Sequence, residues 1–92
     1  MNPARWRTMT ILEQMGNIGS EVERAIRAHE AGGQDRFEHA LDRALGLFDL
    51  TAADDRWRGP RRREILRARE EFCRSAESLK RYFLAFAIAA RR

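Results

Sequence analysis

The sequence predicts an all-α fold, a compact antiparallel four-helix bundle with short loops, and three observations support this prediction. The good helix formers Ala, Leu, Glu and Arg dominate the composition, whereas β-branched residues are scarce. Apolar residues recur at spacings of three and four along most of the chain. A length of 92 residues, of which 43% are hydrophobic, suits a single domain that buries one core, residues 1–92.

The first helix is expected over about residues 10–31, after a short irregular arm at residues 1–9 that Trp6 anchors to the bundle. Thr10 and Glu13 have the spacing of a capping box, in which each side chain bonds a backbone N–H of the first turn. An apolar stripe at spacings of four, three, four and four then predicts the core face. Its members are Ile11, Met15, Ile18, Val22 and Ile26.

The second and third helices are expected over about residues 35–51 and 60–74, with Pro60 at the first position of the third. Arg69 falls in the middle of the third helix's apolar face, where a charge must find a partner or extend to water. We expect a buried ion pair with an aspartate, and a snorkelling or ligand-binding arginine is the alternative. The candidate partners are Asp49, Asp54 and Asp55.

The last helix, about residues 76–91, contains the longest uncharged run of the chain, Tyr82 to Ala90. Ser75 and Ser78 are candidate N-caps and favour a break between the third and fourth helices. A seven-residue repeat instead favours one continuous helix, which would need a partner chain to cover its end. The members of that repeat are Ile65, Phe72, Leu79 and Phe86.

Two apolar sides on this last helix predict a contact between subunits. Leu84 and Ile88 lie opposite its core stripe, and a helix that is apolar on both sides is usually buried on both. We expect a homodimer through this face, with Leu47 and Leu50 as further candidates for the interface. Burial by a neighbouring helix of the same chain is the alternative. The uncharged run is too short to cross a membrane, so no membrane partner is expected.

The composition limits the cellular compartment and the kinds of site that we expect. No apolar run like that of a signal peptide follows the first residues, and Cys73 is the only cysteine, so we expect a cytoplasmic protein without disulfides. The sequence has no cysteine pair and no Gly-rich phosphate loop, so neither a metal nor a cofactor is predicted. The net charge is −2 over residues 1–50 and +6 over residues 51–92, which favours an acidic protein or an RNA as partner of the second half.

A basic and aromatic segment after the second helix is the candidate surface for an anion or a nucleic acid. Basic residues interleaved with aromatic ones can hold phosphates and stack on bases. A solvated charged surface is the alternative. The candidate residues are Arg56, Trp57, Arg58, Arg61, Arg62 and Arg63.

Arg24 and His29 form an Arg-x4-His sequence, which resembles the short motif of the HEPN family, helical bundles that include metal-independent ribonucleases. The resemblance implies that Arg24 binds phosphate and His29 moves a proton, usually across a dimer. Ala25 stands where a polar residue commonly follows the arginine. The spacing also places the two side chains about 140° apart around a helix.

A wider pattern is similar to a family of small bacterial and archaeal helical proteins without an assigned function. It consists of Asn17 to Val22, Asp49 to Thr51, Tyr82-Phe83 and Phe86-Ala87. This resemblance supports the helical fold and implies no activity. We therefore expect a small cytoplasmic interaction or adaptor protein, homodimeric and without enzymatic activity. The alternative is a HEPN-like bundle that binds or cleaves RNA.

Overall fold

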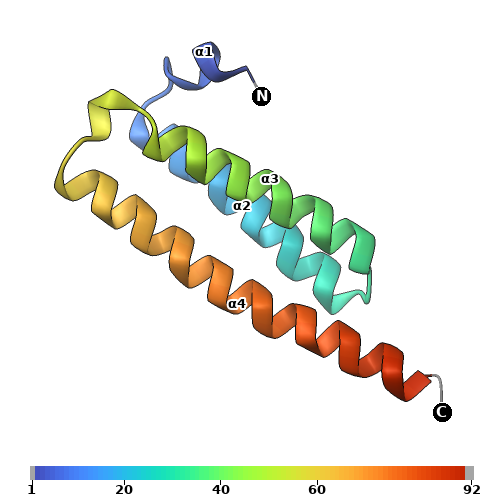
Figure 1. Ribbon diagram of the computed structural model, residues 1–92. Coiled ribbons are helices and arrows are strands. Elements are labelled where there is room, and N and C mark those ends of the chain that lie inside the picture. The colour runs from blue at the N-terminus through green and yellow to red at the C-terminus, as the bar shows by residue number, and fades with distance from the viewer. Residues whose placement is uncertain (1, 91–92) are drawn as a thin grey trace.

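The computed structural model describes the backbone of residues 2–90 and the side chains of residues 2–81. The described part contains helices and no strand, which confirms the predicted all-α class (Figure 1). The elements in chain order are α1 (Pro3–Trp6), α2 (Ile11–Glu30), α3 (Gln34–Ala52), the 3-10 helix η1 (Asp55–Trp57) and α4 (Pro60–Ala90).

Helices α2 and α3 form a hairpin whose ends are set by local sequence. The predicted capping box begins α2: the Glu13 backbone N–H donates to Thr10 Oγ1 at 3.1 Å, and the Thr10 N–H donates to Glu13 Oε1 at 3.1 Å. After α2 the chain turns through Gly32, which has a φ of +74° that an L side chain rarely adopts. Helix α3 then lies alongside α2 (Figure 1).

Helix α4 is continuous, so the break predicted near residues 75–78 is wrong. Ser75 and Ser78 are exposed residues in the helix interior, not caps. No glycine or proline follows Pro60, and the heptad side chains Ile65, Phe72 and Leu79 all pack toward the core without a change of direction. Residues 2–90 therefore form three long α-helices and the single-turn helix α1, and the third and fourth predicted helices are one.

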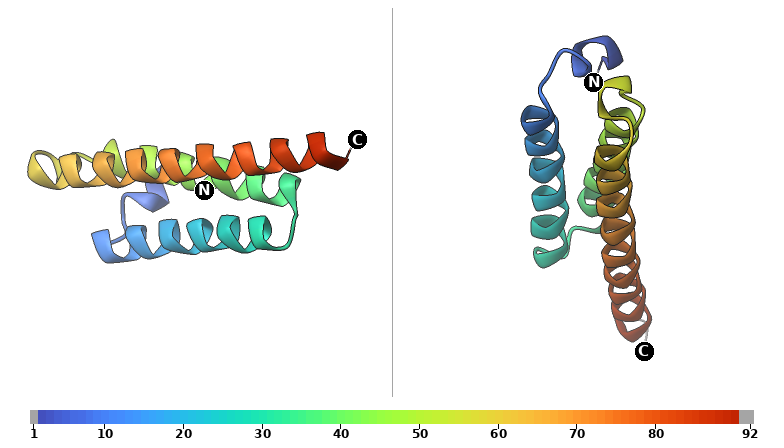
Figure 2. Two further views of the ribbon diagram at one scale, coloured as in Figure 1. Left: turned by 90° about the horizontal axis from the view of Figure 1, so that it is seen from below. Right: turned by 90° about the vertical axis from the view of Figure 1, so that its left-hand side faces the viewer.

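The length of α4 decides the shape of the molecule. It has 31 residues, against 20 for α2 and 19 for α3. Its C-terminal end therefore extends past the turn between α2 and α3, as both views in Figure 2 show. The overall extents are 52 × 22 × 16 Å.

Helix α3 is the central helix, because it packs on both α2 and α4. Two clusters of buried side chains form the core. The cluster near the α2–α3 turn contains Ala25, Ala28, Phe37, Ala40, Leu41 and Ala76. The cluster near the N-terminus contains Trp6, Ile18, Phe48 and Ile65.

The N-terminal arm is fixed to this second cluster. Trp6 is fully buried, as its predicted role as an anchor requires, and Pro3–Trp6 forms one helical turn where an irregular arm was expected. Asn2 Oδ1 caps this turn by accepting from the Ala4 N–H at 2.9 Å. Among the described residues, no helix combines the length and the apolar character that crossing a bilayer requires.

Candidate functional site

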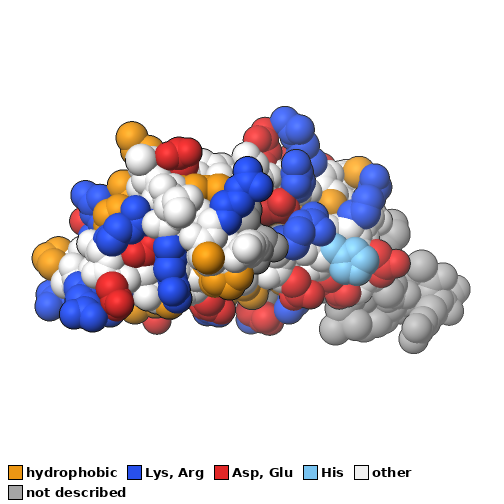
Figure 3. All heavy atoms as spheres, turned by 90° about the horizontal axis from the view of Figure 1, so that it is seen from above, with side chains coloured by type: hydrophobic (Ala, Val, Ile, Leu, Met, Phe, Trp, Pro, Cys, Tyr) orange, Lys and Arg blue, Asp and Glu red, His pale blue; other side chains and the backbone are white. Residues whose placement is uncertain are grey.

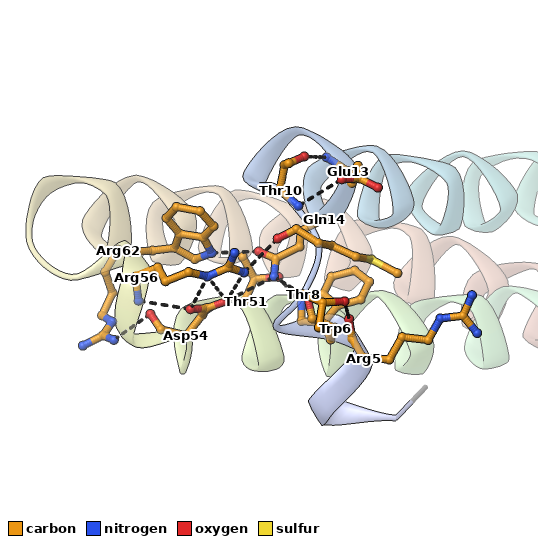
Figure 4. Close-up of polar contacts among 12 residues, drawn as sticks. Arg5, Trp6, Thr8, Thr10, Glu13, Gln14, Thr51, Asp54, Arg56 and Arg62 are labelled. Atoms are coloured by element: carbon orange, nitrogen blue, oxygen red, sulfur yellow. Dashed lines mark hydrogen bonds and ion pairs between the residues drawn. The ribbon is translucent and has the colours of Figure 1, made fainter.

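The most extensive group of buried polar side chains lies where the N-terminal arm meets the ends of α3 and η1 (Figure 4). We call it the polar network. It consists of Trp6, Gln14, Thr51, Asp54 and Trp57. Trp6 Nε1 donates to Thr51 Oγ1 at 2.9 Å, and Trp57 Nε1 donates to Gln14 Oε1 at 2.8 Å. Gln14 Nε2 donates to the Trp6 carbonyl at 2.9 Å and to Asp54 Oδ2 at 3.2 Å.

Asp54 joins the polar network to the segment that contains η1. Its carboxylate accepts from the Arg56 guanidinium at 2.7 Å, and the same guanidinium donates to the Met9 carbonyl at 2.8 Å. Hydrogen bonds from Arg56 hold the pKa of Asp54 at about 2, despite a burial that opposes ionisation. Because these polar groups bond one another, the network ties the arm to the bundle.

Four of the six predicted anion-binding residues line one hollow of about 410 Å³; they are Arg56, Trp57, Arg58 and Arg61. Trp57 carries two guanidinium groups of its own chain, with Arg56 at 4.5 Å and Arg61 at 5.4 Å from the ring centroid. Arg58 pairs with Asp55 at 3.1 Å, and Arg62 donates to the Asp54 carbonyl at 3.3 Å. The half-buried indole therefore lies among guanidinium groups of its own chain in this hollow.

Arg63, the sixth residue, is exposed and lies outside the set that surrounds Trp57. Its backbone N–H donates to the Gly59 carbonyl at 3.2 Å, which is part of the first turn of α4. Arg62 and Arg63 do not line the hollow around Trp57, so the fold gathers four of the six candidates there.

Arg24 and His29 occupy different surroundings on α2. Arg24 is exposed, pairs with Glu21 at 2.8 Å, and lines a hollow between α2 and α3. His29 is half-buried and does not line that hollow; its ring meets Phe37 edge to face at 6.2 Å between centroids. Within one chain, the structure does not bring the two residues to a common site.

Arg69 forms an ion pair with Asp49, one of its three candidate partners, at 2.8 Å. The pair is at the surface and not buried, since the side chain of Arg69 is 33% exposed and that of Asp49 is 63% exposed. The expectation of a buried pair is therefore wrong, because the long arginine side chain carries its charge out to the edge of α3. Arg69 also donates to Cys73 Sγ at 3.7 Å.

The four residues considered for a dimer interface do not lie together in one chain. Leu47 and Leu50 are half-buried and line a hollow of about 680 Å³ between α2 and α3. Leu84 and Ile88 belong to the C-terminal end of α4, and their side chains lie outside the described residues. In Figure 1 this end of α4 lies opposite the end of the molecule that contains the last residues of α3.

An apolar groove between α2 and α4 is the feature that the sequence did not suggest. Both helices pack on α3 and leave between them a hollow of about 260 Å³ near the α2–α3 turn. Its walls are Val22, Ala25 and Ile26 of α2, Phe37 of α3, and Glu71, Phe72, Ser75, Ala76 and Leu79 of α4. Ile26 is 45% exposed there. We call this hollow the α2–α4 groove, and Figure 2 shows the two helices that form it.

In comparisons with known proteins, no family model, no curated protein and no solved structure matches the chain. Among the described residues, no group of His, Cys, Asp and Glu side chains is arranged to hold a metal ion.

Proposed function

We propose that this chain is a small interaction protein without enzymatic activity, which functions as a homodimer through the C-terminal end of α4. One observation carries the proposal. The helix continues past the turn between α2 and α3, and the part that extends is the uncharged segment Tyr82–Ala90 (Figure 1). Among the described residues no other helix reaches alongside this end, and an uncharged helical segment left without a neighbour favours a second chain as its cover.

The α2–α4 groove supports a second copy as the occupant. Its wall on α4 runs from Glu71 to Leu79, a span of nine residues, and the uncharged run Tyr82–Ala90 also has nine residues. Each span is about 13 Å of helix. Two α4 helices that cross in opposite directions near Lys80 would each place their end over the partner's groove. Such an exchange is symmetric and closed, as expected for a two-fold dimer.

This dimer would restore the predicted four-helix arrangement in a different form. Each half would contain α2, α3 and α4 of one chain, with the end of α4 from the partner as the fourth, antiparallel helix. The half-exposed side chains Val22, Ile26 and Leu79 would become buried. Apolar burial of this kind is the main driving force of association.

An adaptor role fits this architecture better than the RNA-cleaving alternative. The hollow that contains Arg24 is formed without His29, and a general base must lie within reach of the nucleophile it activates. We retain the cytoplasm as the proposed compartment, because a single half-buried cysteine suits a reducing environment.

Sedimentation or light scattering at micromolar concentration tests the dimer. The expected mass is twice the 10.7 kDa of the chain, and Leu84→Glu is expected to yield single chains. The matched control is Leu12→Glu on α2, where the side chain is 82% exposed and does not line the groove. A single-chain mass for the unmutated protein would contradict the proposal, as would equal dissociation by the two variants.

A further inference from the structure

The hollow between α2 and α3 that Arg24 lines is bordered by basic side chains. It has a volume of about 420 Å³. We call it the arginine hollow; its walls are Arg24, Arg27, Arg36, His39 and Arg43, over a floor of Ala28, Ala31 and Ala40. On the face shown in Figure 3, Lys and Arg side chains are spread along the molecule between Asp and Glu side chains.

Helical spacing on two facing helices brings the arginines of the hollow together. Arg24 and Arg27 are three positions apart on α2, and Arg36 and Arg43 are seven apart on α3, so each pair follows one edge of its helix. The small alanines between them leave room for a ligand. The hollow belongs to the half of the chain whose net charge is −2, so its basic character is local.

Nearby carboxylates neutralise only part of the positive charge. Glu21 accepts from both Arg24, at 2.8 Å, and Arg43, at 2.9 Å. Glu23 accepts from Arg27 at 2.6 Å. Two carboxylates thus form ion pairs with three of the four guanidinium groups. Because Glu21 pairs with one arginine of α2 and one of α3, it holds both at the rim of the hollow.

Arg36 has no ion pair within residues 2–81. It stands in the first turn of α3, where the helix dipole disfavours a cation unless an anion is near. Asp35 shares that turn but does not line the hollow. The Arg36 guanidinium folds back across the α2–α3 turn, since it lies 2.9 Å from where a Cβ on Gly33 would stand.

We propose that the arginine hollow binds the phosphate chain of a small polyphosphate ligand. Guanidinium groups form paired hydrogen bonds with phosphate oxygens, and arginines from two helices can hold adjacent phosphates at once. The volume is in the range of small-molecule sites. The alanine floor offers no hydrogen bond to a nucleobase, and His39 is the one aromatic ring among the lining residues, so four arginines make the phosphates the main point of recognition. Inorganic tripolyphosphate and a nucleoside triphosphate share this chemistry.

Titration calorimetry with sodium tripolyphosphate, at about 0.15 M ionic strength so that surface charges are screened, tests the site. One ligand per chain is expected, and Arg36→Gln combined with Arg43→Gln is expected to weaken binding at least roughly tenfold. The matched control combines Arg5→Gln with Arg67→Gln, two exposed arginines outside the hollow, which removes the same charge and should leave the affinity unchanged. Arg36→Gln alone, which breaks no ion pair, tests the site without disturbing Glu21.

Each of the other possible results either supports or overturns the proposed phosphate site. Equal weakening by the two double variants would show attraction to net charge and overturn the proposal, as would an absence of binding. Binding of ATP as tight as that of tripolyphosphate would support recognition of the phosphate chain alone. Binding of a single-stranded RNA without binding of tripolyphosphate would overturn the small-ligand proposal.

Discussion

The two ends of this molecule bury their surfaces in different ways. At the end near the N-terminus, the polar network and Trp6 are enclosed by side chains of the same chain. At the end near the α2–α3 turn, the α2–α4 groove stays partly open and α4 continues beyond the hairpin. The first end is specified by directional hydrogen bonds, and the second presents apolar surface.

This difference indicates where stability comes from. Interactions enclosed within one chain stabilise it at any concentration, whereas apolar surface that a second chain must cover contributes only as the dimer forms. Substitutions at the closed end should therefore act on folding, and substitutions at the open end on association. The predictions below separate these two effects.

The largest expected effect on folding is at Trp6. Trp6→Ala removes the largest fully buried side chain and leaves Thr51 Oγ1 without its indole donor. We expect a loss of about 4 kcal/mol in the free energy of unfolding, because a large cavity opens in the core. Urea denaturation of the single-chain Leu84→Glu variant measures it. A loss below about 1 kcal/mol would show that the arm contributes little to the fold.

Asp54 gives the next largest effect, and its pH dependence identifies the cause. The pKa of Asp54 is about 2 in the folded chain and 3.8 as a free side chain, so ionisation stabilises the fold above pH 3.8. That contribution is lost as the pH falls through about 2. Asp54→Asn should cost about 2 kcal/mol near neutral pH, from the lost bonds to Arg56 and Gln14.

The difference between Asp54→Asn and the unmutated chain should shrink as the pH falls toward 2, because Asp54 is then protonated as well. Asp55→Asn is the matched control, since its side chain is 80% exposed and its pair with Arg58 should be worth well under about 1 kcal/mol. If the loss of unfolding free energy caused by Asp54→Asn did not change with pH, Asp54 would stabilise the fold through packing and not through its charge.

Local signals in the sequence were sufficient for the helical class and for the start of α2. The capping box of Thr10 and Glu13 depends on residues three apart, so it needs no knowledge of the fold. The seven-residue repeat through Ile65, Phe72 and Leu79 also indicated the continuous α4. The serines misled the boundary prediction because a serine favours a cap but tolerates a helix interior when neighbouring side chains are buried.

Surfaces were less predictable because they depend on which residues of separate helices meet. Adjacency suggested one patch from Arg56 to Arg63, and four of those six residues do line one hollow. The sequence did not show that Asp54, Asp55 and Trp57 contact three of its arginines. The arginine hollow combines residues 24–27 with residues 36–43, and only the pairing of α2 with α3 brings them together. The spacing of Arg24 and His29 around one helix, in contrast, already argued that they would separate.

The smallest effect on folding is expected at Ile26 in the α2–α4 groove. This substitution is also the sharpest test of the difference between the enclosed end and the open end of the molecule. In the single-chain Leu84→Glu background, Ile26→Ala should cost only about 0.5 kcal/mol, because the side chain is 45% exposed and alanine favours the helix. In the otherwise unmutated chain it should also weaken dimerisation about tenfold, since the partner's α4 would cover this side chain. Sedimentation across a dilution series measures that second effect. The two substitutions should therefore be strongly non-additive, as residues in contact are. Additive effects would place the dimer contact away from the groove, while leaving the enclosed end of the molecule as described.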